Sequence, residues 1–287
     1  MFSPMALDIQ SAGGTTASRL ARLEGEGLLI LGDRPFVLKD GERSLVSASA
    51  SRGGTKNISL DPATGRVGGA AEDADVGALA RLLGRYAAWA TALVGEVAPR
   101  YAPAIAPGRT SFRPRPVEDG AASPRKDDRR LHADAFPSRP VGGRRILRVF
   151  SNIDPAGEAR VWRVGEPFED YARRWLPRAR RNLPGEAWAL ERLGVTKNRR
   201  TDHDALMLGL HDRAKLDADY QATAPRREVR FPAGTSWMVF TDSVVHAAIS
   251  GRRALEQTFL LPVSAMADET ASPLRILERL TGRTLAP

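Results

Sequence analysis

Residues 131–155 read LHADAFPSRPVGGRRILRVFSNIDP, and this stretch decides how we interpret the rest of the chain. It begins with His132 and Asp134, passes through a Pro/Gly turn and continues into an apolar, strand-like run. Residues two apart on a strand point to the same face of a sheet, so the His132 imidazole and the Asp134 carboxylate can reach one point together. The stretch therefore predicts two of the three protein ligands of a metal site.

A third ligand is predicted downstream at His246. This histidine lies in a run of β-branched and small residues, 244–249, which predicts a buried strand. Two histidines and one carboxylate form the facial triad that leaves one side of an Fe(II) ion open to small ligands. His203 and His211 are alternative ligands, but they are about two turns apart on one predicted helix and therefore too distant to share a metal.

The composition of the 287-residue chain limits the chemistry further. Cysteine is absent, which excludes disulfides and thiolate ligands, so any metal must be held by nitrogen and oxygen atoms. The formal net charge of +9 predicts an acidic partner or substrate, although arginine is abundant along the whole chain and a general compositional bias explains the charge equally well. Because no apolar span or signal-peptide pattern is present, we expect a soluble, cytoplasmic protein.

Residues 1–105 predict an N-terminal β/α region that packs on the core. Short apolar runs at 27–31, 35–38 and 57–60 predict a small antiparallel sheet, and a periodic segment after Asp75 predicts an amphipathic helix that Pro99 ends. Residues 102–130 lack a period and predict either a loop that leads into the His-Asp stretch or a linker. Its candidate anion contacts are Arg113, Arg115, Arg125 and Lys126.

Residues 106–287 predict a mainly β core with flanking helices, an α+β fold. Strand-like runs at 145–152, 228–231, 237–240, 244–249 and 255–261 are joined by turns, which favours an antiparallel jelly roll. A helical insertion is expected at about 168–220 and a C-terminal helix at about 272–282. The insertion carries Arg173, Arg174, Arg178, Arg180 and Arg181, which could meet an acidic substrate or form a solvated face.

Arg148 interrupts the apolar run of residues 145–152 and shares a face with Asn152. A buried guanidinium needs a carboxylate or phosphate partner, because an unpaired buried charge costs several kcal/mol. That partner could be an acidic ligand or a carboxylate of the protein itself. Both alternatives remain open at this point.

These motifs resemble those of Fe(II)/2-oxoglutarate-dependent oxygenases, in which a His-x-Asp pair precedes a distal histidine. Within residues 125–262, four stretches resemble more closely the Kdo 3-hydroxylases of Gram-negative bacteria, where Kdo is 3-deoxy-D-manno-oct-2-ulosonic acid. The stretches are RKDDRRLHADAFPSRP, RVFSNIDP, ALMLGLHDRAKLDADYQ and VFTDSVVHAAISGRRALEQTFLLP. The resemblance implies a double-stranded β-helix, the cupin-like form of the jelly roll.

The same resemblance implies the cofactors and the reaction. His132, Asp134 and His246 would bind Fe(II), with 2-oxoglutarate and O2 as co-substrates and ascorbate as a candidate reductant. The family hydroxylates C3 of Kdo attached to lipid A, which converts Kdo to Ko. For the distal carboxylate of 2-oxoglutarate the superfamily uses a basic residue about ten positions after the distal histidine, where this chain has Glu256 and Gln257. The candidates here are therefore Arg253, Arg148, Asn152 and Thr258.

Kdo2-lipid A, or a related acidic glycolipid, fits a basic enzyme, with Arg113, Lys126 and His211 as candidate substrate contacts. We expect a peripheral protein at the cytoplasmic face of the inner membrane, with a homo-oligomer as one arrangement, and no nucleic acid partner, because aromatic residues do not interleave with the basic runs. Two alternatives remain. One is a hydroxylase of a protein or peptide side chain, and the other is a non-catalytic jelly-roll module that binds acidic saccharides.

Overall fold

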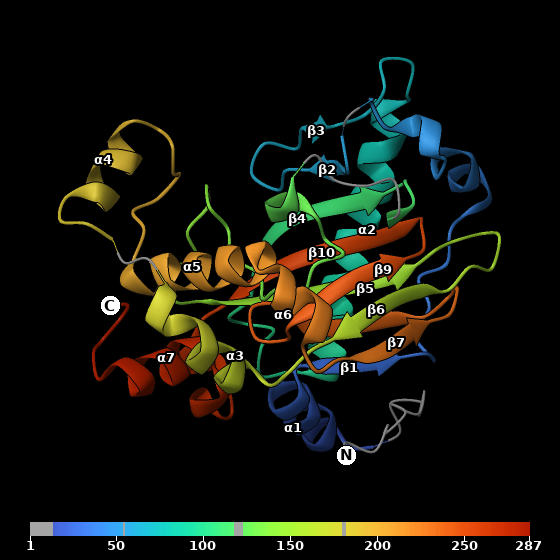
Figure 1. Ribbon diagram of the computed structural model, residues 1–287. Coiled ribbons are helices and arrows are strands. Elements are labelled where there is room, and N and C mark those ends of the chain that lie inside the picture. Colours follow the sequence, from blue (N-terminus) through green and yellow to red (C-terminus); the bar gives the residue numbers. More distant parts are fainter. Residues whose placement is uncertain (1–13, 54, 118–122, 180–181) are drawn as a thin grey trace.

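Two antiparallel sheets form the body of the protein, and the computed structural model describes the chain except residues 1–13, 54, 118–122 and 180–181 (Figure 1). Among the described residues, the larger sheet has the strand order β1-β8-β5-β10-β4-β2-β3 and the smaller sheet β7-β6-β9. The strands of the larger sheet are, in that order, Leu28–Leu31, Ser236–Phe240, Arg145–Asn152, Ala254–Leu261, Ala106–Arg113, Ile58–Leu60 and Val67–Gly68. Those of the smaller sheet are Arg227–Phe231, Arg160–Val164 and His246–Ser250.

Aromatic side chains fill the space between the two sheets. Phe150 of β5 stacks on Trp237 of β8 at a ring distance of 5.2 Å, and Trp162 of β6 packs edge-on against both rings. Valine and leucine side chains from both sheets complete this cluster. Two antiparallel sheets packed face to face in this way form a jelly roll, which confirms the predicted α+β class with a cupin-like core.

The opposite face of the larger sheet is covered by α2 (Val76–Val97), which lies behind the sheet in Figure 1. Its buried side chains belong to the clusters that contain Leu147 and Val149 of β5 and Leu255 of β10. Asp75 caps the helix by accepting a hydrogen bond from the Ala78 amide, as the sequence predicts. The helix α1 (Thr16–Glu26) packs beside β1.

Helices gather at one end of the jelly roll and cover the segments that carry the predicted metal ligands (Figure 1). Leu131, Ala133, Val245 and Ala247, the neighbours of His132 and His246 in sequence, are buried in one cluster with these helices. The helices of this cluster are α3 (Phe168–Trp175), α5 (Asp202–Leu216), α6 (Ala218–Thr223) and α7 (Pro273–Thr281). The predicted insertion is thus helical, and it also contains α4 (Glu186–Arg192).

Short 3-10 segments connect these elements. They are η1 (Asp40–Leu45), η2 (Ala48–Ala50), η4 (Pro124–Lys126), η5 (Leu176–Arg178), η6 (Val263–Ala265) and η7 (Glu269–Ala271). Across the parts of the chain that the structure describes, we find no helix with the length and apolar composition that crossing a bilayer demands.

The predicted separate N-terminal sheet is wrong. β1 pairs with β8, and β2 pairs with β4, so these strands extend the larger sheet at its two edges. Residues 35–38 are not a strand; Phe36 is buried against Tyr86 and Trp89 of α2, which explains the apolar pattern there. The division of the chain at residue 105 stays a prediction.

One other expectation also needs correction. Residues 102–130 are not one loop, because β4 (Ala106–Arg113) lies within them and pairs with β10. The pairing shifts register near Gly108, where a Cβ atom would lie 3.1 Å from the Thr258 carbonyl oxygen, so Pro107 and Gly108 mark a strand irregularity. The strands β7 and β8 follow each other in sequence, as predicted, and one belongs to each sheet.

Candidate metal centre

His132 and His246 are held opposite each other by backbone pairing. The amide of each residue donates to the carbonyl of the other, at 3.0 and 2.8 Å, which forms an isolated antiparallel bridge. Their rings lie 4.7 Å apart on the same side of this bridge. Asp134 follows two residues later, and its amide donates to the Thr241 carbonyl at 2.7 Å. The spacing predicted from sequence therefore brings the three side chains together.

The three side chains present ligand atoms that lie within 4.8 Å of one another. Nδ1 of His132 lies 2.7 Å from the Arg130 carbonyl oxygen, and Nδ1 of His246 lies 2.8 Å from the Val244 carbonyl oxygen. These carbonyls require the proton on Nδ1, so each Nε2 keeps its lone pair for a ligand bond. Nitrogen and oxygen donors in this number suit Fe(II) and other divalent transition metals. The residues present fit a metal of this kind.

The charge states of the cluster also suit metal binding. Burial lowers the pKa of His246 to about 3, and the neighbouring His132 acts in the same direction, so His246 is neutral at neutral pH. Burial alone raises the pKa of Asp134, but Arg148 and both histidines outweigh this effect and hold it well below the usual value. The cluster therefore offers a neutral imidazole and an ionised carboxylate, which are the forms that bind metals.

Arg148 links this cluster to a chain of buried charges. Its Nη2 lies 2.9 Å from Oδ2 of Asp134, and its Nη1 lies 2.7 Å from Oε1 of Glu256. Arg113 pairs with the other Glu256 oxygen at 2.6 Å and with Asp128 at 3.3 Å. The guanidinium of Arg148 thus has protein carboxylates as partners. The Nε atom of Arg148 is nevertheless buried without a hydrogen bond among the described residues.

The two arginines also control the charge of Glu256. Burial raises the pKa of this carboxyl, but Arg113 and Arg148 outweigh burial and lower it below its usual value. Glu256 is therefore ionised and balances both guanidinium groups. Sequence reasoning noted this residue at the place of a basic one but did not predict that it pairs with Arg148, which lies more than 100 residues earlier in the chain.

The other candidates for binding 2-oxoglutarate lie on β5, on β10 and in the turn that precedes β10. Arg253 pairs with Asp154 at 2.7 Å, and the Asn152 amide group donates to the backbone carbonyls of Glu158 and Phe231. Asn152 is four residues from Arg148, about 13 Å along β5. Thr258 pairs in register with Arg148 and so lies across from it on β10. In the structure, Arg148 contacts Asp134 of the triad and Thr258 lies across from Arg148, whereas Arg253 pairs with Asp154.

Two further histidines lie near the site but outside the ligand cluster. The His211 ring lies 5.3 Å from the His132 ring, and its Nδ1 lies 3.0 Å from an Asp212 oxygen. His203 is buried, and it lines a small pocket together with Asp134 and Met207. Both residues lie on α5, as predicted, and that they cannot share a metal stays a prediction. His211 remains a candidate substrate contact because it lies beside the triad.

The predicted anion contacts fall at different distances from the cluster. Arg113 reaches it through Glu256, and Arg125 pairs with Asp212 at 3.1 Å, beside His211. The Lys126 carbonyl accepts a hydrogen bond from the Lys56 ammonium group. Arg115 donates to Ser51 at 3.1 Å. Of the arginine run in the helical insertion, Arg173, Arg174 and Arg178 each pair with a carboxylate, while Arg180 and Arg181 lie outside the described residues.

Trp162 is a site residue that the sequence reading missed. Its indole stacks on the His246 ring, with the centroids 4.9 Å apart and the planes inclined by 22°. This contact fixes one face of the ring. The signal available in the sequence was the alternation of residues 160–164, RVWRV, which places Trp162 on one face of a strand together with Arg160 and Val164.

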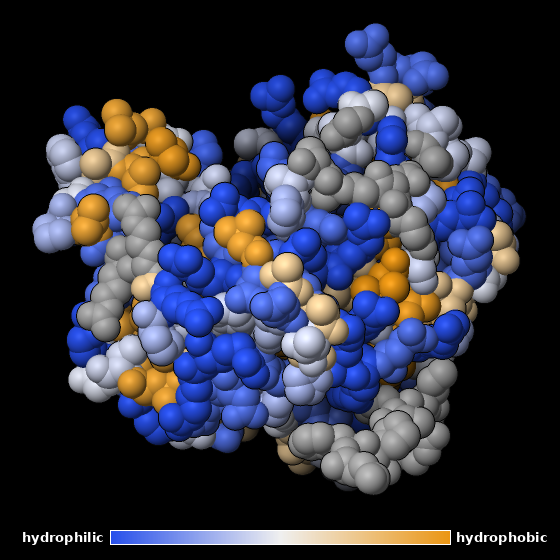
Figure 2. Space-filling view, viewed as in Figure 1, coloured by the Kyte–Doolittle hydropathy of each residue, from blue (hydrophilic) through white to orange (hydrophobic). Residues whose placement is uncertain are grey.

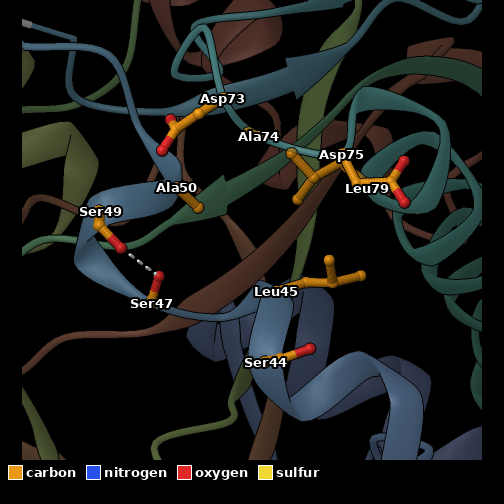
Figure 3. Close-up of a pocket in the computed structure, with 9 residues that line it drawn as sticks. All are labelled: Ser44, Leu45, Ser47, Ser49, Ala50, Asp73, Ala74, Asp75 and Leu79. Carbon is orange, nitrogen blue, oxygen red and sulfur yellow. Dashed lines mark hydrogen bonds between the residues drawn. The ribbon is translucent and has the colours of Figure 1, made fainter.

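A surface pocket elsewhere on the protein lies between the η1 and η2 segments and the start of α2 (Figure 3). Ser47 and Ser49 share a hydrogen bond of 2.8 Å there, and Asp73 and Asp75 supply its charge. Its other lining residues are Ser44, Leu45, Ala50, Ala74 and Leu79. Two carboxylates repel an acidic ligand, so this pocket does not match the partner that the basic composition predicts.

The fold and the cluster together define a class: a cupin-like jelly roll with a site built from two histidines and one carboxylate. Comparison with protein families finds a match over residues 8–284 to the family described as 3-deoxy-D-manno-oct-2-ulosonic acid (Kdo) hydroxylase. The chain belongs to this family, as its motifs predict. A comparison with curated proteins returns no match.

Solved structures of the Kdo hydroxylase KdoO, a non-heme Fe(II) alphaketoglutarate dependent dioxygenase, are similar to the whole chain. The cobalt(II) complex is 40% identical with a TM-score of 0.90, and the complex with alphaketoglutarate and Fe(III) is 40% identical with a TM-score of 0.89. Each match covers 99% of this chain and 94% of the other. A complex with succinate and Fe(III) matches equally well.

Proposed function

We propose that this protein is an Fe(II)- and 2-oxoglutarate-dependent hydroxylase that adds a hydroxyl group at C3 of Kdo in Kdo2-lipid A. The observation that carries the proposal is the cluster of His132, Asp134 and His246 inside a jelly roll, with both Nε2 atoms available to a metal. The family match and the metal and alphaketoglutarate complexes of KdoO support it.

His132, Asp134 and His246 would hold the Fe(II). A bound Fe(II) supplies redox chemistry in which O2 and 2-oxoglutarate yield succinate and CO2 while one oxygen atom enters a C–H bond of the substrate. The protein residues orient and insulate this site. The Arg130 and Val244 carbonyls fix the tautomers of the histidines, and Trp162 covers one face of His246. Ascorbate would serve as an external reductant of the metal.

Arg148 is the residue that we assign to the distal carboxylate of 2-oxoglutarate. Its planar guanidinium can form paired hydrogen bonds with a carboxylate, and its Nε is buried without a hydrogen bond among the described residues. Thr258, its neighbour in register, can add a hydroxyl donor. Arg253 and Asn152 are weaker candidates because of their positions: Asn152 lies about 13 Å beyond Arg148 along β5, and Arg253 pairs with Asp154, just after that strand ends.

Basic residues and a histidine near the site would recognise the acidic sugar. The proposed contacts are Arg113, Lys126 and His211. His211 lies beside the metal ligand His132, Arg113 is linked to the cluster through Glu256, and Lys126 lies in the η4 segment. The Kdo carboxylate and lipid A phosphates are anions, which suits a chain of net charge +9. We further propose that the enzyme works as a peripheral protein at the cytoplasmic face of the inner membrane.

Succinate formation tests the proposed function against its alternatives. The purified protein is incubated with Fe(II), 2-oxoglutarate and ascorbate in air, with Kdo2-lipid A, with lipid A lacking Kdo, or with a peptide mixture. We expect Kdo2-lipid A alone to raise succinate formation well above the uncoupled rate. Stimulation by peptides would favour a protein hydroxylase, and absence of turnover in iron-loaded protein would favour a binding module.

A further inference from the structure

A protruding segment of the chain exposes an unusual concentration of apolar side chains. Leu183, Trp188, Leu193 and Val195 have exposed fractions of 62, 58, 77 and 53%. They surround α4, which projects from the body in Figure 1, and Figure 2 shows hydrophobic residues gathered over it. The other large exposed apolar residues among those described, Val37, Val76 and Leu216, are scattered singly along the chain.

The segment is held by its own backbone bonds rather than by burial. Gly185 adopts a left-handed conformation, with φ of 79°, that starts α4, and the Glu186 side chain accepts a hydrogen bond from the Leu183 amide. After the helix, the Val195 amide donates to the Leu190 carbonyl at 2.9 Å. Every residue of α4 is at least partly exposed. The fold therefore defines the shape of this segment while leaving its apolar groups in water.

The base of the segment is tied to the loop that follows the metal ligands. The Lys197 amide donates to the Ser138 carbonyl at 3.0 Å, and the Arg200 guanidinium donates to the Pro137 carbonyl at 2.9 Å. Pro137 is three residues after Asp134 in the chain. The segment thus stands on the same loop that leads away from the candidate metal centre.

Basic side chains accompany the apolar ones. Residues 182–200 contain four basic residues, Arg192, Lys197, Arg199 and Arg200, and two acidic ones. One of the acidic residues, Glu186, is occupied with the Leu183 amide. Arg192, Lys197 and Arg199 are exposed beside the apolar group. This surface therefore combines exposed apolar side chains with exposed positive charges.

We propose that residues 183–199 form a docking site for an anionic phospholipid bilayer. Tryptophan and leucine side chains enter the boundary between headgroups and acyl chains, and Lys and Arg bind the headgroup phosphates. This inference rests on the proposed function in one respect: membrane docking is useful to the enzyme because a lipid-linked sugar must be reached from the membrane surface. Docking through this segment places the candidate metal centre close to such a substrate.

Vesicle binding by the full-length protein, without iron or substrate, tests the proposal. The probe is phosphatidylcholine vesicles with or without phosphatidylglycerol, and the readouts are co-sedimentation and tryptophan fluorescence. Trp162, Trp175 and Trp237 are buried and Trp89 packs against Phe36 and Tyr86, so a blue shift on binding reports mainly on Trp188. We expect binding to phosphatidylglycerol vesicles that weakens as salt is raised.

A paired variant locates the binding surface. Trp188→Ser with Leu193→Ser should weaken vesicle binding at least about tenfold, because each large apolar side chain changes a partition constant by roughly this factor. Both residues are exposed, so the variant should keep the melting temperature of the parent. The matched control, Val37→Ser with Val76→Ser, removes two exposed apolar residues elsewhere and should bind vesicles like the parent.

Three outcomes would overturn the inference: no binding by the parent, unchanged binding by the Trp188/Leu193 variant, or equal loss in the control. Loss of a homodimer in that variant during analytical ultracentrifugation without vesicles would instead identify a second copy of the chain as the occupant. Failure of the proposed function is distinguishable, because it would leave the vesicle result intact. Turnover of a water-soluble Kdo oligosaccharide should be equal in parent and variant.

Discussion

The two faces of β5 and β10 have different roles. Leu147 and Val149 on one face, with Leu255 and Phe259, pack under α2 as an apolar layer. Arg148 and Glu256 point to the other face, toward the candidate metal centre. Alternation along two neighbouring strands thus separates the residues that stabilise the fold from those that hold charge at the site. Changes on the two faces should have different consequences.

The largest effect is expected from removing a proposed metal ligand. Asp134→Ala should lower 2-oxoglutarate turnover at least about 1000-fold, or roughly 4 kcal/mol in the barrier, because it removes a ligand and leaves Arg148 without one carboxylate partner. Anaerobic Fe(II) titration and succinate assays measure the effect. Retention of parental turnover by a folded variant would remove Asp134 from the site.

The apolar face should respond in stability instead. Leu147→Ala creates a cavity under α2 and should lower the free energy of unfolding by about 2–5 kcal/mol. Below the unfolding transition, Fe(II) affinity should stay at the parental value. Urea titration and metal titration of the same preparation measure both quantities. A loss of metal affinity without a loss of stability would contradict the separation of the two faces.

A smaller effect is expected when lysine replaces arginine at position 148. Arg148→Lys should raise the KM for 2-oxoglutarate about tenfold, because lysine cannot form the paired hydrogen bonds of a guanidinium. Arg253→Lys is the matched control and should leave this KM unchanged. Fe(II) affinity, measured without 2-oxoglutarate, checks that the contact of Arg148 with Asp134 is not the cause. The reverse ranking of the two variants would assign the carboxylate to Arg253.

A further effect is a pH dependence of stability in metal-free protein. His246 has a folded pKa lowered to about 3 by burial, so the unfolded chain binds its proton first as the pH falls below about 6.5. Stability should therefore decrease between pH 6.5 and pH 3, by at most about 1.4 kcal/mol per pH unit for this one group. Urea midpoints measured across that range, with His246→Gln as the comparison, should show a shallower slope in the variant. Parallel slopes would exclude His246 as the titrating group.

The triad was predictable from sequence because it depends on local rules. His132 and Asp134 are two residues apart, and the residues around His246 have the composition of a buried strand. The longest helix was equally accessible, since its period and its Asp75 cap are local signals. Family resemblance supplied the substrate and cofactors, which the residue patterns alone left open.

What the sequence did not reveal depends on long-range pairing. β1 lies at one edge of the larger sheet and β2 next to the other, because their partners are more than 50 residues away in sequence. Pro107 and Gly108 interrupt the strand pattern of β4, so this strand was not predicted. Glu256 becomes the partner of Arg148 and Arg113 only when three strands are placed side by side. The alternation of polar and apolar residues predicts a face, but it does not predict which distant strand supplies the opposing charge.

Mass spectrometry of Kdo2-lipid A tests the proposed hydroxylation of Kdo. The substrate is incubated with the protein, Fe(II), 2-oxoglutarate and ascorbate in air, and fragmentation locates any added atom. We predict a gain of one oxygen atom at C3 of Kdo that is absent with Asp134→Ala. Unmodified Kdo2-lipid A after incubation with iron-loaded protein that still forms succinate would contradict the claim.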